Sequence, residues 1–233
     1  MKVSVVIPTL DEERWLPGAI ASVRDDAFEV VVVDGGSSDR TREKAAALGA
    51  RAFQASRGRG NQLHRGASEA RGDLLLFLHA DTRLEAGWSE ALHGLEPRVV
   101  GGAFRFALDT ERVSRRYAEW AVGLRCRVLG VPYGDQAIFC RREAYAAAGG
   151  FPAEPLFEDV AFVRRLRRVG PTVLLPPRAV TSARRWEREG SAFTTMRNNA
   201  LVLLFLAGVS PRRLAAVYES GRSLVPGRRR PPS

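Results

Sequence analysis

The first half of the chain alternates apolar runs with amphipathic segments. Residues 2–8 and 29–34 are rich in valine and end in turn residues, and a third apolar run covers 73–78. Runs that are apolar on both faces are typical of buried parallel strands. Residues 11–26 have helical periodicity with an acidic first turn, and 35–49 predict a glycine turn, a serine cap, a helix and a glycine stop. This alternation predicts an α/β fold with a Rossmann-like, mainly parallel sheet flanked by helices.

The rest of the chain is less regular, and its pattern predicts shorter units. We expect strands and helices in the segments 50–56, 57–72, 99–108, 113–130, 133–151, 157–170, 172–186, 198–208 and 211–220. From this pattern we expect one domain over residues 1–186 and a C-terminal helical hairpin over 187–220 that packs on it. Residues 221–233 are basic and proline-rich, which predicts a disordered tail.

Composition narrows the class of protein. The 233 residues suit one α/β domain, and 45% hydrophobic residues supply a sizeable core. The net charge of +10 attracts polyanions such as nucleic acid, anionic membranes or phosphorylated small molecules. Cys126 and Cys140 are too few for a disulfide framework and lack zinc-site spacing, which favours a reduced, cytoplasmic setting. The N-terminus lacks a signal-peptide pattern, and the apolar stretch 200–209 is shorter than the roughly 20 residues that span a bilayer.

Two ligand-type side chains, His79 and Asp81, follow the third apolar run in "FLHADT". Alternate side chains of an extended segment point to the same face, so these two can converge on one ion or one substrate group. The plainer alternative is a turn aspartate and a half-buried, hydrogen-bonded histidine. Ligands of such sheets bind outside the carboxyl ends of the strands, where Pro8, Thr9 and Asp34 are also expected.

Four motifs in this order carry a family resemblance: "VVIPTLDEE", "VVVDGGSSDRT", "FLHADT" and "GGFPAEPLFEDVAFVRRLRRVG". Over about residues 2–186 the chain resembles family 2 glycosyltransferases of the GT-A fold. The resemblance implies a nucleotide-sugar donor, usually a divalent metal, and inversion at the anomeric carbon. A compact chain with "HAD" and "RRW" also resembles a bacterial subgroup sometimes linked with arsenosugar biosynthesis.

The resemblance implies which residues bind the nucleotide base of the donor. It implies that Pro8, Thr9 and Glu12 line the base pocket, with an acid in a helix's first turn as the alternative for Glu12. The Asp34 carboxylate can accept from an imide N–H or a ribose hydroxyl, and its alternative role is a turn acid that caps a helix. UDP is the expected nucleotide, from family frequency alone.

The donor diphosphate needs cations. Arg57 and Arg59 flank a glycine in a loop that opens a helix, an arrangement that suits phosphate, although RNA contact or a solvated turn are alternatives. Arg185 is a further candidate for the diphosphate, because Arg185-Trp186 matches the end of a Gln-x-x-Arg-Trp motif of the processive branch. The glutamine is missing, so we do not expect processive polymer synthesis.

The family's metal motif is Asp-x-Asp, and here Asp81 matches its last carboxylate while His79 replaces the first. A divalent ion neutralises a diphosphate leaving group. An imidazole with a carboxylate should favour Mn²⁺ over Mg²⁺. Hydrogen bonding of His79 to phosphate is the alternative to direct coordination.

An inverting transfer needs one carboxylate to take the acceptor's proton. The family's Glu-Asp motif makes Asp159 this general base and leaves Glu158 an architectural role near the acceptor, while helix capping is the alternative for both. Two neighbouring carboxylates should raise the pKa of one of them. Further acceptor contacts are expected from Asp135, Gln136, Gly150 and Trp186, with a polar turn, a helix cap and core packing as their alternatives.

The acceptor itself, a small molecule or a lipid-linked compound, is open, and we expect no nucleic-acid partner. The apolar hairpin with flanking arginines predicts packing on the domain or a homodimer interface, with peripheral contact to an anionic membrane as the alternative. Competing functions are a nucleotidyltransferase, which usually has a basic glycine-rich loop after the first strand, a polyanion-binding protein, and an inactive donor-binding module.

Overall fold

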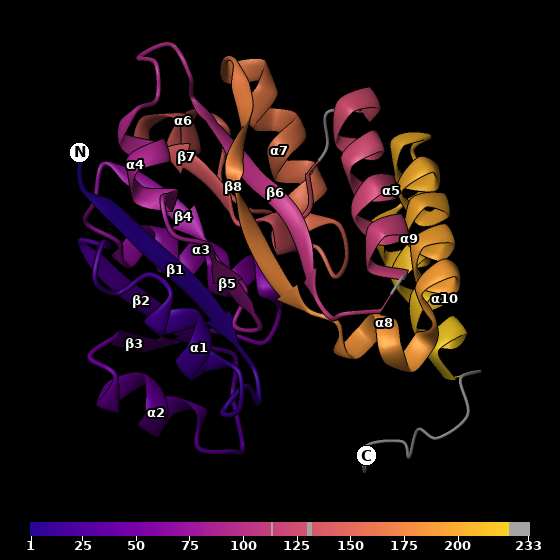
Figure 1. Cartoon of the computed structure of the whole chain (residues 1–233), viewed down its shortest axis with the longest axis horizontal. Coiled ribbons are helices and arrows are strands. Elements are labelled where there is room, and N and C mark those ends of the chain that lie inside the picture. The colour runs from indigo at the N-terminus through magenta and orange to yellow at the C-terminus, as the bar shows by residue number, and fades with distance from the viewer. Residues whose placement is uncertain (113, 130–131, 224–233) are drawn as a thin grey trace.

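The computed structural model describes residues 1–112, 114–129 and 132–223, and within these ranges eight strands form one mixed sheet (Figure 1). The strand order is β3-β2-β1-β4-β7-β6-β8-β5. The strands are β1 (Val3–Thr9), β2 (Glu29–Asp34), β3 (Arg51–Gln54), β4 (Leu74–Phe77), β5 (Thr82–Leu84), β6 (Gly101–Asp109), β7 (Ile138–Arg141) and β8 (Thr172–Ser182). The first four strands pair in parallel, as predicted.

The second half of the sheet departs from a purely parallel arrangement. β7 runs antiparallel to both β4 and β6, β6 pairs with β8 in parallel, and β5 returns antiparallel to β8. The register between β6 and β8 shifts where Pro176 and Pro177 enter β8. Proline lacks an N–H to donate, so a bulge is where a strand tolerates it.

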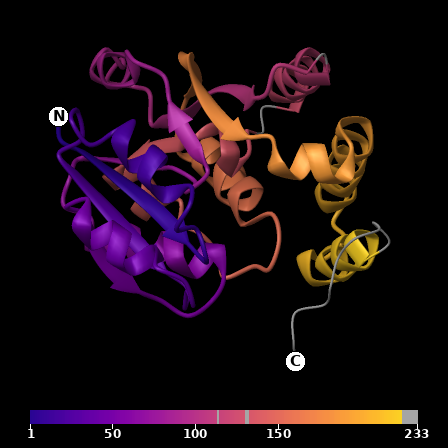
Figure 2. The ribbon, with the colours of Figure 1, turned by 60° about the horizontal axis from the view of Figure 1, so that its bottom comes forward.

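Helices cover both faces of the sheet (Figures 1 and 2). One core cluster joins the sheet to α1 (Leu16–Ala21), α2 (Thr41–Ala47) and α4 (Trp88–His93). A second joins it to α3 (Arg59–Glu69), α6 (Arg142–Ala147) and α7 (Glu158–Val169). Because both faces are buried, the strands read as continuous apolar runs in the sequence.

The close approach of α3 to the sheet sets the position of the candidate site. A Cβ on Gly66 would lie 2.3 Å from Cγ1 of Val6, and a Cβ on Gly60 would lie 2.1 Å from the carbonyl oxygen of Pro152. The Gln62 side chain donates to the carbonyls of Thr9 (2.7 Å) and Val33 (2.9 Å), at the ends of β1 and β2. These contacts fix the first turn of α3 against the carboxyl edge of the sheet.

A separate helical layer follows, formed by α5 (Ser114–Leu129), α8 (Arg184–Glu189), α9 (Ser191–Leu206) and α10 (Pro211–Ser223). Ala118 and Val122 of α5 pack on Phe106 of β6. Leu201 and Leu214 of the hairpin α9–α10 pack on Phe157 and Val160, at the start of α7. The hairpin therefore packs on the α/β core, and the boundary expected at residue 186 falls inside α8.

Two local predictions differ from the structure. The helix expected over residues 11–26 is shorter, because residues 12–15 form a turn in which Trp15 and Leu16 donate to the Glu12 carbonyl. The serine cap expected before α2 is wrong: the helix begins at Thr41, whose N–H donates to the Asp39 carboxylate at 3.0 Å. The tail beyond residue 223 lies outside the described residues, and no helix within them is long and apolar enough to cross a bilayer.

Candidate active site

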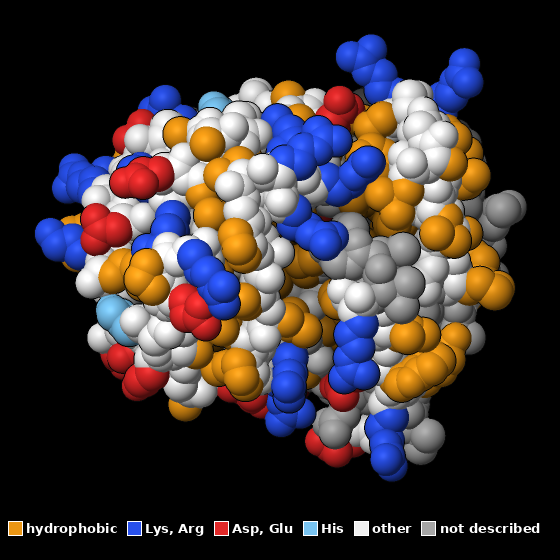
Figure 3. Space-filling view, turned by 90° about the horizontal axis from the view of Figure 1, so that it is seen from above, with side chains coloured by type: hydrophobic (Ala, Val, Ile, Leu, Met, Phe, Trp, Pro, Cys, Tyr) orange, Lys and Arg blue, Asp and Glu red, His pale blue; other side chains and the backbone are white. Residues whose placement is uncertain are grey.

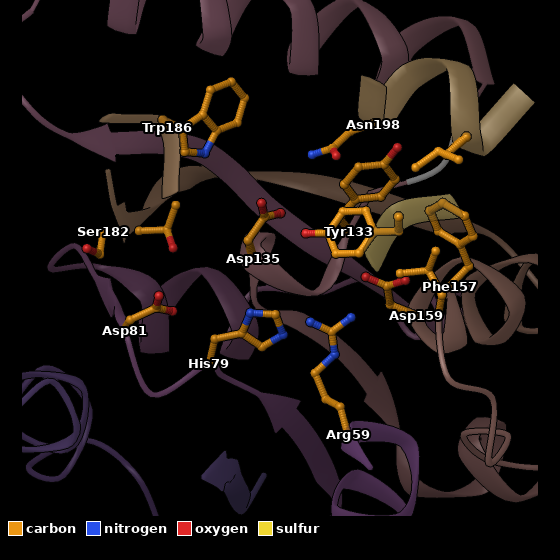
Figure 4. Close-up of a pocket in the computed structure, with 14 residues that line it drawn as sticks. Arg59, His79, Asp81, Tyr133, Asp135, Phe157, Asp159, Ser182, Trp186 and Asn198 are labelled. Atoms are coloured by element: carbon orange, nitrogen blue, oxygen red, sulfur yellow. The ribbon is translucent and has the colours of Figure 1, made fainter. Parts of the chain in front are cut away.

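Two cavities meet at the carboxyl edge of the sheet. The first, here the strand-side cavity, is lined from β1 by Pro8 and Thr9 and from nearby segments by Glu12, Arg57 and Arg184. The second, the helix-side cavity, is lined by Tyr133, Asp135, Asp159 and Trp186 together with α9 and α10. Both cavities share Arg59, His79 and Asp81. Most of the predicted site residues therefore surround one connected space (Figure 4).

Arg184 connects two acids of the strand-side cavity. Its Nη2 lies 2.6 Å from Oε1 of Glu12 and 2.9 Å from Oδ2 of Asp81, and its guanidinium lies 5.5 Å from the centre of the Trp15 ring. Burial opposes the charge of Arg184, but the two carboxylates raise its pKa above the ordinary value. Burial raises the pKa of Glu12, and Arg184 only partly offsets this. The other Glu12 oxygen, Oε2, is buried and has no hydrogen-bond partner among the residues that the structure describes.

Arg59 lines both cavities. Its Nε donates to the carboxylate of Glu158, a side chain with almost no exposed surface. Burial raises the pKa of Glu158, the charge of Asp159 adds to this, and Arg59 opposes it. Burial disfavours the Arg59 cation, yet Glu158, Asp159 and Asp135 together raise its pKa. Glu158 therefore positions Arg59 and does not itself line either cavity.

Asp159 lies in the first turn of α7, after Phe157, whose φ of 63° turns the chain into the helix. Its Oδ2 accepts from the Gly134 N–H at 2.7 Å, and its Oδ1 accepts from the Val160 N–H at 2.7 Å. A Cβ on Gly134 would lie 2.5 Å from Nε2 of His79 and 3.4 Å from Oδ2 of Asp159. The imidazole and the carboxylate thus approach the same backbone position. Figure 4 shows both side chains among those that line the helix-side cavity.

Three further predicted contacts lie elsewhere. The Asp34 carboxylate is buried in its own turn, where it accepts from the N–H groups of Gly36 and Ser37. The Gln136 side chain accepts from the Tyr133 N–H and donates to the Phe104 carbonyl. The Gly150 carbonyl accepts from Arg165 at 2.5 Å. None of these three residues lines the cavities, and the Arg185 side chain lies outside the described part of the chain.

Several lining residues were not predicted. Arg184 lies one position before the arginine that the motif indicates, and Asn198, Leu201 and Tyr218 come from the hairpin. The "RRW" motif gave a signal for Arg184 but not for which arginine faces the cavity. Nothing local marks the hairpin residues, because their place depends on how α9 and α10 pack on α7.

A divalent ion has two candidate side-chain donors here, His79 and Asp81. The described residues contain no group of three or more histidine, cysteine or acidic side chains that could hold a metal ion. An ion in such a site takes its other ligands from substrate phosphates and water, which Mg²⁺ and related ions commonly do. The donor set fits a metal that binds together with a diphosphate, and Arg184 competes with it for Asp81.

Comparison with known proteins agrees with this geometry. Residues 4–116 match the family model described as glycosyl transferase family 2. Glycosyltransferase AglD of Haloferax volcanii is 31% identical over 185 residues, which cover 69% of this chain and 28% of AglD. The chain spans about a quarter of the length of the curated relatives that it matches. The matched part is 28% of the first relative, 28% of the second and 24% of the third.

Solved structures share the fold. Glucosyl-3-phosphoglycerate synthase from Mycobacterium tuberculosis, in complex with Mn²⁺, UDP and its product, superposes with a TM-score of 0.55 at 22% identity over 75% of this chain and 70% of that one. The same enzyme has also been solved with Mg²⁺ and UDP. Residues 1–349 of S. aureus TarS, in complex with UDP-GlcNAc, give a TM-score of 0.58 at 17% identity over 78% of this chain and 59% of that fragment.

The mixed sheet, its flanking helices and these structural likenesses define a protein of the GT-A glycosyltransferase fold. Within that class, the family-model match over residues 4–116 and the likeness to AglD point to glycosyltransferase family 2. The family match favours glycosyl transfer over the nucleotidyltransferase and polyanion-binding alternatives. The resemblance to the arsenosugar-linked subgroup stays a prediction.

Proposed function

We propose that this protein is an inverting glycosyltransferase that moves a sugar from a nucleotide-sugar donor, with UDP as the nucleotide, to an acceptor hydroxyl. The observation that carries the proposal is the joining of two cavities at Arg59, His79 and Asp81. A donor whose diphosphate lies at this junction extends its base into the strand-side cavity and its sugar toward Asp159.

In the strand-side cavity, Pro8, Thr9 and Glu12 would contact the base and ribose. The buried, unpartnered Oε2 of Glu12 is an acceptor for a donor N–H or hydroxyl. Arg57, Arg59 and Arg184 supply the positive charge that a diphosphate needs. Asp34 would act indirectly, by fixing the turn after β2.

His79 and Asp81 would hold Mn²⁺ or Mg²⁺ together with the diphosphate. When bound, the ion stabilises the negative charge that develops on the leaving diphosphate. The metal ion would compete with Arg184 for the Asp81 carboxylate, and both oxygens of Asp81 become available when the ion pair opens. The released guanidinium then remains in the cavity beside the phosphates.

Asp159 would act as the general base. The acceptor oxygen attacks the anomeric carbon opposite the diphosphate, its proton passes to the Asp159 carboxylate, and the bond between the anomeric carbon and the phosphate oxygen breaks with its electron pair on the diphosphate. The N–H groups of Gly134 and Val160 orient the carboxylate. Asp135, Trp186, Tyr133 and Asn198 surround the remaining space and would hold the acceptor.

A thermal-shift panel tests this function. UDP, GDP, dTDP and their sugars are each added with Mn²⁺, Mg²⁺ or EDTA, because a ligand that binds the folded state raises the melting temperature. We expect a rise with UDP and UDP-sugars that needs the divalent ion. A panel in which no nucleotide shifts the melting temperature would reject the proposal.

A further inference from the structure

The outer surface of the helical layer is unusually apolar for an exposed surface. Among the described residues, twelve large hydrophobic side chains are exposed, and eight of them lie on α5, α9 and α10. We call this surface the α5–α9–α10 face, and its apolar members are Tyr117, Trp120, Leu124, Phe193, Met196, Leu203, Leu204 and Val217. Such a concentration marks an interaction surface, whereas single exposed apolar residues need no explanation.

Helical spacing gathers these side chains into stripes. On α5 they stand at i, i+3 and i+7 (Tyr117, Trp120, Leu124), and on α9 Phe193, Met196 and Leu203 follow at i, i+3 and i+10. Residues so spaced share one side of a helix. α5 packs against α9, and α9 against α10, so the stripes belong to one helical layer.

The opposite sides of the same helices are occupied inside the protein. Ala118 and Val122 of α5 pack on β6, while Leu201 of α9 packs on α7 and lines the helix-side cavity. Core packing therefore explains the inner stripes, whereas the outer stripes remain exposed to solvent. Trp120 and Met196 are 63% and 69% exposed.

The exposed charged side chains described on α5, α9 and α10 are all arginines. Arg116 and Arg127 of α5 and Arg212 and Arg213 of α10 are exposed. Among the exposed side chains that the structure describes on these three helices, none is acidic. In Figure 3, hydrophobic side chains gather over the right-hand part of the molecule, where α5, α9 and α10 lie, with Lys and Arg side chains beside them.

We propose that the α5–α9–α10 face docks on an anionic lipid bilayer, with its apolar side chains in the headgroup region and its arginines on lipid phosphates. Apolar side chains bordered by cations are what peripheral binding to such a surface requires. A second copy of this chain fits less well, because it would bring arginine toward arginine between molecules that each carry +10. The proposal does not depend on the glycosyl-transfer chemistry.

Co-flotation of the whole chain with lipid vesicles tests this surface. One set of vesicles is pure phosphatidylcholine and the other is equimolar phosphatidylcholine and phosphatidylglycerol. We expect flotation with the anionic vesicles, at least tenfold more than with the neutral ones, and a loss at high salt because salt screens the arginine contribution.

The decisive variant is Trp120→Ser/Met196→Ser, which should reduce flotation at least tenfold while thermal melting stays cooperative. Leu174→Ser is the matched control, since Leu174 is an exposed leucine on β8, away from this face. Arg212→Gln/Arg213→Gln should weaken binding to anionic vesicles only. Flotation of the serine variant at the wild-type level, or no flotation of the wild type, overturns the proposal. Self-association that the serine variant abolishes, without vesicle binding, also overturns it and assigns the face to a second copy.

Discussion

The guanidinium of Arg184 lies 2.9 Å from the carboxylate of Asp81, the residue that the sequence indicates as a metal ligand. The same nitrogen lies 2.6 Å from Glu12, so one cation is shared by two acids of the strand-side cavity. A metal ion bound to Asp81 would compete with Arg184 for the negative charge of this carboxylate. Arg184 is therefore placed to couple metal binding to donor binding, because an incoming diphosphate offers it a new anionic partner.

Replacing Arg184 should change the affinities for Mn²⁺ and for UDP in opposite directions. In Arg184→Met, we expect the affinity for Mn²⁺ without nucleotide to rise about fivefold, since a partly exposed ion pair contributes about 1 kcal/mol at most. The affinity for UDP should fall roughly tenfold, because a charge-assisted contact worth about 1.5–3 kcal/mol is lost. Titration of free Mn²⁺ by electron paramagnetic resonance and calorimetry with UDP measure both effects.

Arg98→Met is the control for the loss of one positive charge, since Arg98 pairs with Glu96 on an exposed surface. It should change neither affinity. If Arg184→Met weakened Mn²⁺ binding as well, competition for Asp81 would be excluded.

Asp159→Asn isolates the proposed base. The amide keeps an acceptor oxygen but cannot take a proton, so transfer should fall by about 10²–10⁴-fold while UDP-sugar affinity stays within a factor of about three. The rate of transfer is measured as release of UDP in the presence of an acceptor. The affinity for the UDP-sugar is measured by calorimetric titration. Asp25→Asn, at an 84% exposed side chain, is the surface control. Undiminished transfer in Asp159→Asn would exclude this residue as the base.

Glu29, at the start of β2, should make the stability of the protein depend on pH in the acidic range. Burial alone would raise its pKa, but hydrogen bonds from Ser4, Arg71 and Arg51 lower it below the ordinary value of 4.5. A carboxyl with a lowered pKa in the folded state stabilises the protein above the unfolded-state pKa, and this stability is lost as the pH falls through the folded-state value.

We therefore expect Glu29→Gln to lower the free energy of unfolding by about 1–3 kcal/mol at neutral pH and by much less at acidic pH. Urea unfolding at neutral pH and below pH 4.5, the ordinary pKa of Glu29, measures this difference. Glu96→Gln, at an exposed ion pair, should cost under about 1 kcal/mol at either pH. An equal loss in Glu29→Gln at both pH values would contradict the assignment.

Sequence reasoning was most reliable where local pattern decides structure. The apolar runs predicted β1, β2 and β4, and their common carboxyl edge placed Thr9, His79 and Asp81 together, because parallel strands end at one side of a sheet. The sequence carries no local signal that β7 lies antiparallel between β4 and β6, because its apolar residues look like those of any buried strand.

Side-chain roles in the site depended on partners distant in the chain. Glu158 and Asp159 look alike in sequence, yet Arg59, 99 residues earlier, engages Glu158 and leaves Asp159 on the cavity. Arg184 and Arg185 are neighbours in one motif, and the start of α8 decides that Arg184 reaches Asp81. Such choices are made by packing, which hydrophobic periodicity does not encode.

Gly134 offers the sharpest test of the site's geometry. A Cβ there would lie 2.5 Å from Nε2 of His79, which is too close, and 3.4 Å from Oδ2 of Asp159, which is ordinary contact. Because the imidazole is at the end of a side chain, it can rotate away, so Gly134→Ala should displace His79 while the fold stays intact. We expect metal-dependent UDP affinity to fall roughly tenfold, the scale of one lost charge-assisted or metal contact, with a melting temperature within a few degrees of wild type.

Gly123→Ala is the matched control, because a Cβ at Gly123 of α5 meets nothing within 4 Å and alanine favours a helix. It should leave UDP affinity unchanged and raise the melting temperature slightly. Any weak residual affinity for UDP in EDTA should be the same in Gly134→Ala and wild type, since the arginines and the base pocket are untouched. A Gly134→Ala protein that binds UDP with Mn²⁺ as tightly as wild type would show that His79 is not needed at the metal, and Asp81 would remain the single side-chain ligand.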